Sequence, residues 1–270
     1  MGNLIVSWSP VPGQGASTLT LSLASMLALD TTHTVMFTHA HNSQTLLDRL
    51  FTTTNENNVA DNGMEGLERL VKSNLLKAES VPDYSEKIYL RKLDYLQGGL
   101  NEERSDIENT AFLLSVLKAS LQAYDLIFVD LESGVDAITT RELIKQADVV
   151  IVSLPQNRYV VENFVNGDSI PDELRERDYF VVINQYDNDA TFSLRNIRRQ
   201  IKTKQKMFAL PYTTALKNAI NLGNVSDFYF RSTKSKKGDA THQLTEAIRD
   251  INGQVLDSLG FTGNAGVVNE

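Results

Sequence analysis

The sequence predicts an α/β fold with a mostly parallel, twisted sheet and helices on both faces. Short apolar runs alternate with helical patterns along the chain, which is typical of right-handed β-α-β units. The apolar runs of the second half, such as 126–129 and 149–154, contain at most one polar residue. Strands have this composition when helices cover both of their faces.

The first half of the chain begins with a buried-strand pattern at 3–8 that ends at a cluster of Pro and Gly. We expect a helix over 17–29, because its apolar residues recur at helical spacing and it contains neither Gly nor Pro. A polar stretch at 52–62 indicates a loop. The other elements expected here are strands 34–37 and 87–96 and helix 63–77.

The second half shows a clearer alternation. It predicts a helix over 106–122 and strands over 126–129, 149–154, 179–183 and 207–210. A terminal helix over 240–259 is amphipathic. Its apolar side contains Leu244, Ile248, Ile251, Val255 and Leu259.

The composition limits the class of protein. With 41% hydrophobic and 22% charged residues, the 270-residue chain is too apolar for a disordered protein and lacks the composition of a fibre. It has no repeat or long linker, so we expect one domain over 1–260 and a flexible tail over 261–270. The absence of cysteine excludes disulfides and favours the cytoplasm. No apolar run approaches the roughly 18 residues of a membrane span, so we expect no integral membrane segment.

The first strand leads into a glycine-containing loop and then a helix, which is the context of a phosphate-binding loop. The six residues expected to surround a phosphate are Gly13, Gln14, Gly15, Ala16, Ser17 and Thr18. Gly13 and Gly15 would let backbone amides turn toward the anion, and Ser17 stands where a hydroxyl normally reaches Mg²⁺. Ala16 stands where the lysine of such loops is expected.

This loop resembles that of the deviant P-loop ATPases of the ParA/MinD type, which reads Lys-Gly-Gly-x-Gly-Lys-Thr-Thr. Val11 replaces the family's signature lysine, which reaches across a dimer, and Pro12 replaces its first glycine. After the second strand the family has an Asp-x-Asp-Pro-Gln element that serves hydrolysis. Here the stretch at 39–44 reads His-Ala-His-Asn-Ser-Gln, so that carboxylate is missing.

Three later stretches extend the resemblance over most of residues 3–223. The run 124–134 is similar to the family's strand that ends in an acid and a switch glycine, and it places Asp130 near Mg²⁺ through water. Asn184 matches the position that contacts adenine, and Pro211, with the stretch at 219–223, resembles the loop and helix beside the base. The resemblance therefore implies a nucleotide site that includes the six loop residues with Asp130, Asn184 and Pro211, and a metal at Ser17 and Asp130.

The stretches 63–73 and 96–99 resemble the TadZ/CpaE branch of this family. Members of that branch position pilus or secretion machinery, often with altered nucleotide loops. The resemblance implies a homodimer with partners in a pilus, secretion or conjugation apparatus, recruited by them to the cell pole or membrane.

The substitutions predict a pseudo-ATPase that acts as a scaffold or positioning factor. Phosphoryl transfer depends on positioning and charge neutralisation, and three charged groups of the family's site are missing. The sequence leaves two states open: ATP or ADP with Mg²⁺ bound weakly, or no cofactor at all. An active ATPase for DNA partition or conjugation is the alternative, with Arg158 as a conceivable replacement cation.

A basic segment over 195–206 is the candidate for nonspecific DNA binding, although the net charge of −8 disfavours binding over the whole surface. Its cationic residues are Arg195, Arg198, Arg199, Lys202, Lys204 and Lys206. ParA-like proteins bind DNA through basic surfaces near their carboxyl-terminal half. The competing interpretation, which the broad spread of these charges favours, is a solvated helix.

Other interpretations remain open at this point. Gly13 and Gly15 would also suit a simple turn, Asp130 a helix cap, and Asn184 a turn residue. The pair His39 and His41 would suit zinc, but no third ligand is evident. A Rossmann dinucleotide site is disfavoured because Thr18 stands in place of the third glycine. An interaction domain that binds no nucleotide is a further alternative, and it differs from the main hypothesis only at the pocket.

Overall fold

The computed structural model describes residues 1–42, 45–51, 62–98, 104–201 and 205–261. In this part of the chain one sheet has the strand order β3-β4-β2-β5-β1-β6-β7-β8, and all neighbours are parallel except β3 and β4. The strands are β1 (Asn3–Trp8), β2 (Val35–Ala40), β3 (Glu86–Tyr89), β4 (Leu93–Tyr95), β5 (Leu126–Leu131), β6 (Val149–Pro155), β7 (Phe180–Tyr186) and β8 (Met207–Pro211). The predicted mostly parallel α/β fold is confirmed.

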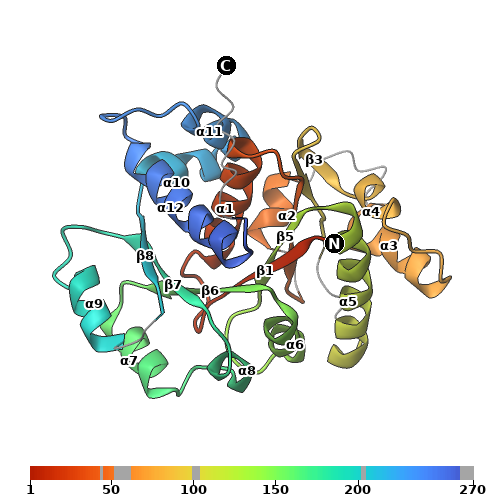
Figure 1. Ribbon diagram of the computed structural model, residues 1–270, viewed down its shortest axis with the longest axis horizontal. Helices are drawn as coiled ribbons and strands as arrows, with labels where there is room; N and C mark the ends of the chain where they lie inside the picture. Colours follow the sequence, from red (N-terminus) through yellow and green to blue (C-terminus); the bar gives the residue numbers. More distant parts are fainter. Residues whose placement is uncertain (43–44, 52–61, 99–103, 202–204, 262–270) are drawn as a thin grey trace.

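Helices cover both faces of the sheet (Figure 1). One layer contains α1 (Ala16–Asp30), α2 (Leu46–Phe51), α10 (Thr214–Asn221), α11 (Val225–Ser232) and α12 (His242–Ser258). The opposite layer contains α5 (Asp106–Ala123), α6 (Ile138–Gln146), α7 (Arg158–Asn166), α8 (Asp172–Arg175) and α9 (Leu194–Ile201), with α3 (Gly63–Lys72) and α4 (Ser80–Asp83) packed against α5. The sequence explains where α5 begins, because Ser105 and Glu108 form a capping box at its start.

Each face of the sheet has its own hydrophobic core. Along β1, Leu4, Val6 and Trp8 point into the core under α5 and α6, whereas Ile5 points into the core under α1 and α12. This alternation is the period of two that a strand imposes on its side chains. Trp8, the only tryptophan of the chain, is fully buried, and its Nε1 donates to the carbonyl O of Gly134 at 2.8 Å.

Three predicted elements differ from the structure. The expected strand 87–96 is a hairpin of β3 and β4, because Arg91 has a φ of 61° and turns the chain back. Helix 63–77 ends at Lys72, where Asn74 adopts a φ of 55° and Leu75 N bonds to the carbonyl O of Leu70.

Strand 34–37 continues to Ala40, because β2 pairs with β5 residue by residue as far as Leu131. The expected loop at 52–62, apart from Asn62, and the expected tail from 262 onward lie outside the described residues. Phe261, the described end of the tail, packs its ring against His33 with centroids 4.9 Å apart.

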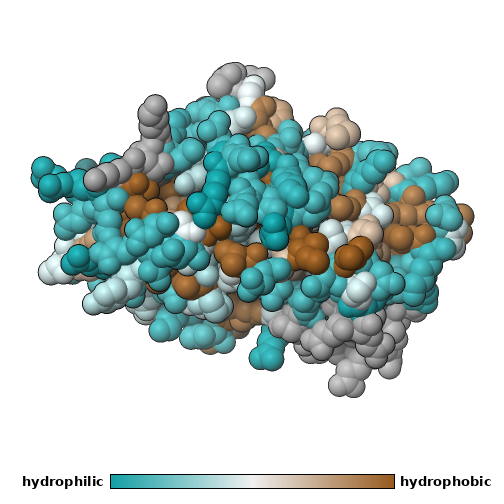
Figure 2. Space-filling model, turned by 90° about the horizontal axis from the view of Figure 1, so that it is seen from below, coloured by the Kyte–Doolittle hydropathy of each residue, from teal (hydrophilic) through white to brown (hydrophobic). Residues whose placement is uncertain are grey.

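No helix in the described part of the chain combines the length and the apolar character that a membrane span needs. On the face seen in Figure 2, apolar side chains reach the surface in several separate patches between polar ones.

Candidate functional site

The loop between β1 and α1 spans residues 9–15 at the carboxyl edge of the sheet. Gly13 and Gly15 have positive φ values of 74° and 81°, and Gly15 is the N-cap of α1. The first amides of this 15-residue helix are therefore available to an anion in front of it, where the helix dipole also favours negative charge. The loop has the backbone geometry that a phosphate site requires.

The end of β7 packs against this loop. Asn184 Nδ2 donates to the carbonyl O of Gln14 at 3.1 Å. A Cβ on Gly15 would lie 2.8 Å from Asn184 Nδ2 and 2.9 Å from Gln185 Nε2, so the close approach requires glycine. Asn184 is 3% exposed and belongs to β7, so its interpretation as a turn residue is wrong.

Three buried polar residues form one row across the sheet beside the loop. Ser7 of β1 and His39 of β2 are both in register with Asp130 of β5, so their side chains share the face that α1 covers. Asp130 Oδ1 and Ser7 Oγ have no hydrogen-bond partner among the described residues. The N-cap of the following helix, α6, is Ala137, so the interpretation of Asp130 as a helix cap is wrong.

The other oxygen of Asp130 has two partners. Ser17 Oγ donates to Oδ2 at 2.5 Å, and His41 Nε2 lies 3.0 Å from the same atom. Burial opposes a charge on His41, but the hydrogen bond and the negative charge of Asp130 outweigh it and raise the pKa of His41 above 6.5. The structure thus brings Ser17 and Asp130 together as expected, and it adds His41 to them.

The second histidine belongs to a separate cluster. His39 Nε2 lies 3.0 Å from Asp48 Oδ2, and Tyr95 Oη donates to Asp48 Oδ1 at 2.7 Å. Burial alone would raise the pKa of Asp48, but the hydrogen bond and charge of His39 lower it well below its ordinary value. His39 and His41 therefore bind different carboxylates, and no group of three potential metal ligands occurs among the described residues. The zinc interpretation has no support in this geometry.

A cavity of about 210 Å³ adjoins the loop on the side of α10. This volume is below the roughly 300–1,000 Å³ of sites that enclose a whole drug-sized ligand, so the cavity suits part of a ligand, such as a base. Gly15, Thr18, Asn184 and Pro211 line it, which brings together predicted site residues from three separate segments. The other lining residues are Gln185, Leu210, Tyr212, Thr213, Leu216, Lys217, Ile220 and Asn221.

The charges of the site agree with the sequence expectation at Ala16 and differ from it at Arg158 and Lys217. Ala16 is buried at the start of α1, where it contributes no charge to the loop. Arg158 is bound to Glu162 on the same helix at 2.7 Å and lines a hollow with residues of α9, not the cavity beside the loop. Lys217, which the sequence did not mark, is a cation that lines that cavity. It lies two residues before the segment 219–223, whose resemblance to the helix beside the base was the nearest signal.

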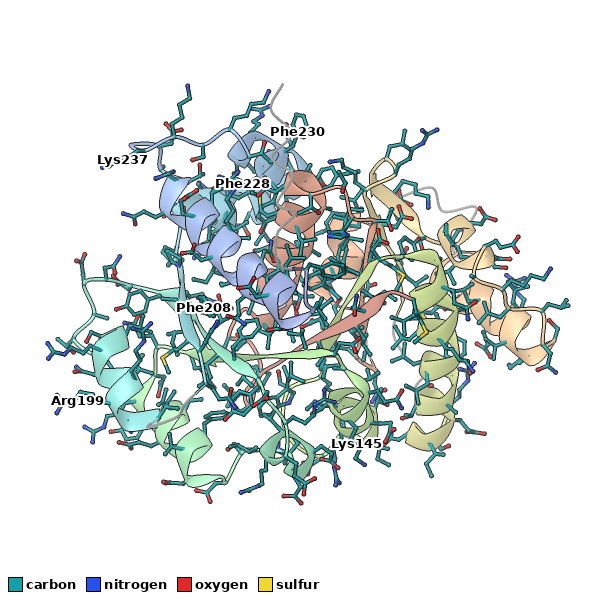
Figure 3. The ribbon with its side chains drawn as sticks, viewed as in Figure 1. Lys145, Arg199, Phe208, Phe228, Phe230 and Lys237 are labelled. Atoms are coloured by element: carbon teal, nitrogen blue, oxygen red, sulfur yellow. The ribbon has the colours of Figure 1, made fainter. Side chains whose placement is uncertain are left out.

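The candidate nucleic-acid residues have different surroundings. Arg195 and Arg199 are exposed on α9, and Figure 3 shows Arg199 on the outer side of that helix. Arg198 is exposed as well, but its Nη2 donates to the carbonyl O of Met207 at 3.0 Å, and Lys206 Nζ contacts Gln254. The two remaining candidates, Lys202 and Lys204, lie outside the described residues. Arg199 and Arg158, with Phe192, line an open hollow of about 410 Å³.

A strand, a glycine loop at a helix N-terminus and an acid on the neighbouring strand define a P-loop type of α/β protein. The sequence matches no protein-family model and no curated protein. Solved structures do match, and they include ParA family, plasmid partition and MinD proteins.

A ParA family ATPase from Chlorobium tepidum superposes with a TM-score of 0.68 at 14% identity, over 93% of this chain and 99% of that one. A putative plasmid partition protein from Borrelia burgdorferi, bound to AMPPNP, superposes with a TM-score of 0.67 at 17% identity, over 94% of this chain and 100% of that one. The MinD protein of Pyrococcus horikoshii, complexed with Mg-ADP, superposes with a TM-score of 0.64 at 14% identity, over 98% of this chain and 100% of that one. At these identities the comparisons show the fold, which is that of the ParA/MinD P-loop ATPases.

Proposed function

We propose that this chain is a nucleotide-binding pseudo-ATPase of the ParA/MinD type. One observation carries the proposal: the cavity beside the glycine loop is retained, while Ala16 replaces the phosphate lysine next to it. Gly15 and Thr18 join this cavity to the loop, and Asn184 and Pro211 belong to its wall. A base and a phosphate chain of one ligand would fit this arrangement.

The missing charges support weak or absent turnover. Removing one partner of a buried charge pair costs about 2–5 kcal/mol, which is roughly 30-fold to several thousand-fold in affinity. Cationic groups at the transferred phosphoryl group are worth about 10³–10⁵ in rate. The chain has Val11 and Ala16 where the family has two lysines, and histidines where it has an acid.

The proposed cellular role is that of a scaffold or positioning factor. We infer a homodimer that works with a pilus, secretion or conjugation machine in the cytoplasm and is recruited to the pole or membrane by its partners. The TadZ/CpaE resemblance supports this role, and its two segments lie together: Met64 N donates to the carbonyl O of Gln97 at 2.8 Å.

Calorimetry with ATP and ADP tests the nucleotide site. We expect binding to the wild type and a loss of at least about tenfold in Ile220→Trp, since Ile220 lines the cavity and the larger side chain would fill it. Leu222→Trp is the matched control, because Leu222 follows the same helix, is 74% exposed and does not line the cavity. In the wild type, the fluorescence of its single tryptophan, Trp8, which is bonded to Gly134 near the loop, gives a second readout.

Two results would contradict the proposal. If neither nucleotide bound at millimolar concentration, the site would be a relic and the chain an interaction domain. If ATP were hydrolysed and Asp130→Ala abolished the hydrolysis, the protein would be an active ATPase.

The exposed arginines of α9 favour a second candidate, an active DNA-partition or conjugation ATPase that binds DNA nonspecifically. Arg195→Ala/Arg199→Ala is then expected to weaken binding to any duplex and to reduce the salt slope by about 0.9 for each lost phosphate contact. Fluorescence anisotropy over a range of salt concentrations measures this slope. Lys236→Ala/Lys237→Ala is the control, because these exposed lysines lie in the loop after α11, where Figure 3 places Lys237 far from α9. Equal loss in both variants, or no binding, would contradict the assignment.

A further inference from the structure

P-loop sites hold Mg²⁺ with the loop hydroxyl and with an acid at the end of a neighbouring strand. Ser17 and Asp130 are the corresponding residues of this chain, and their 2.5 Å hydrogen bond leaves the hydroxyl lone pairs available to a metal. The fit of Mg²⁺ to this site therefore depends on what else contacts Asp130.

His41 is the residue that does not fit a metal site. Its Nε2 lies 3.0 Å from Asp130 Oδ2, and a carboxylate can only accept hydrogen bonds, so Nε2 carries a hydrogen directed at that oxygen. Mg²⁺ keeps several of its waters when it binds to proteins. Of the two oxygens of Asp130, Oδ1 is buried without a partner among the described residues, and Oδ2 is the one that Ser17 contacts, so a water on a metal at Ser17 would reach Asp130 at Oδ2. The imidazole N–H thus holds the place that a metal-bound water would need.

Imidazole does not replace the water as a ligand. Mg²⁺ prefers carboxylate, carbonyl and water oxygens, whereas imidazole suits zinc, copper, iron and nickel. An N–H that is directed at Asp130 has, in addition, no lone pair to offer. Both the ligand type and its hydrogen bond oppose Mg²⁺ at this position.

A second set of contacts fixes His41. Its backbone N donates to His39 Nδ1 at 3.3 Å, and the two rings pack edge to face with centroids 5.4 Å apart. His39 is fully buried and bound through Nε2 to Asp48, which Tyr95 and the backbone N of Thr45 also hold. Displacing His41 would therefore disturb a buried network and not a single exposed side chain.

From these contacts we propose that the chain binds its nucleotide without a divalent metal ion, with His41 in the place of the Mg²⁺ hydration shell at Asp130. The proposal rests on the nucleotide site proposed above. It replaces the expected metal role of Ser17 and Asp130 with a hydrogen-bonded group that contains Ser17, His41 and Asp130.

The test is ADP affinity measured by calorimetry in Mg²⁺ and in EDTA. For the wild type we expect the two dissociation constants to agree within about threefold. His41→Ala frees Asp130 Oδ2, so Mg²⁺ should tighten its ADP binding by about tenfold or more. His41→Gln keeps an N–H donor and should behave like the wild type. His33→Ala is the matched control, because His33 lies before β2 and contacts Asp125 and Phe261 instead of Asp130.

Two results of this experiment would overturn the proposal. One is a wild-type affinity that Mg²⁺ tightens by about tenfold; the other is a folded His41→Ala protein that still ignores Mg²⁺. A second measurement separates this proposal from the nucleotide site itself, since it needs no nucleotide. If ADP fails to bind but the ring ¹H–¹⁵N signals of His41 stay unchanged in millimolar Mg²⁺, the nucleotide site fails while the exclusion of Mg²⁺ by His41 stands. A saturating shift of these signals would overturn that exclusion.

Discussion

The buried carboxylate of Asp48 binds donors from several other residues. It accepts hydrogen bonds from His39, from Tyr95 and from the backbone N and hydroxyl of Thr45, and it is 2% exposed. These donors stabilise the ionised form, which is why the pKa of Asp48 falls despite its burial. A carboxylate that is stabilised in this way holds the chain after β2 against β4.

We expect Asp48→Asn to lower the free energy of unfolding by about 3 kcal/mol near pH 7, because an amide cannot accept from all of these donors. A pKa that is lower in the folded state gives stability that is present above the unfolded value of 3.8 and is lost as the pH falls toward the folded value. The difference between wild type and variant should therefore be constant from about pH 7 to pH 5 and shrink below about pH 4. Urea unfolding over this range measures it, and a difference that grew on acidification would contradict the ionised assignment.

At the scale of elements, the site depends on the contact between the loop after β1 and the end of β7. Gly15 allows this contact for two reasons: it adopts a positive φ of 81°, and it lacks a Cβ that would meet Asn184. Gly13 has a similar φ of 74°, but a Cβ there would meet no atom within 4 Å. Comparing alanine substitutions at the two glycines therefore separates the cost of backbone strain, which both share, from the cost of a side-chain clash, which only Gly15 has.

Gly13→Ala should cost about 1–2 kcal/mol of unfolding free energy from the left-handed backbone alone. Gly15→Ala should cost about 1 kcal/mol more, because the added Cβ would displace Asn184 Nδ2 from the carbonyl O of Gln14. Only Gly15→Ala is expected to weaken nucleotide binding through the base cavity. Thermal unfolding and calorimetry check both statements, and equal costs at the two positions would show that the contact contributes nothing.

At the scale of the whole molecule, apolar side chains collect around the carboxyl edge of the sheet. Four exposed residues follow strands that end at this edge. Leu46, Ile138 and Tyr159 lie at the starts of the helices after β2, β5 and β6, and Tyr212 comes directly after β8; they are 45%, 44%, 75% and 49% exposed. The glycine loop opens at the same edge, and Val11 there replaces a charged residue of the family. An apolar edge of this kind supports the proposal that a second copy of the chain binds here.

Light scattering with and without nucleotide tests the proposed dimer. We expect Ile138→Glu/Tyr159→Glu to weaken it by about 2–4 kcal/mol, roughly 30- to 1,000-fold, because two apolar anchors become charged. Leu75→Glu is the control, since Leu75 is 60% exposed but follows the carboxyl end of α3. A wild type that stays monomeric at all concentrations, or a dimer indifferent to the double variant, would contradict this interface.

Local patterns in the sequence determined the order of the elements and most of the loop that begins the site. The run 3–8 and the glycines at 13 and 15 follow from apolar periodicity and from the residue types that a phosphate site needs, whereas the acid at 130 follows from the resemblance to the ParA/MinD family. The hairpin of β3 and β4 escaped prediction, because its turn at Arg91 lacks the Gly or Asn that would mark a positive φ.

Only the tertiary structure decided which groups meet at the site. His41 is 89 residues from Asp130, Ser17 is 113 residues from it, and Asn184 is 170 residues from Gln14. Parallel strands bring such distant residues to one edge of the sheet, and no local pattern records which side chains face each other there. The sequence alone thus determined that the phosphate loop lacks its lysine, whereas the fold determined that a histidine holds the position next to the acid.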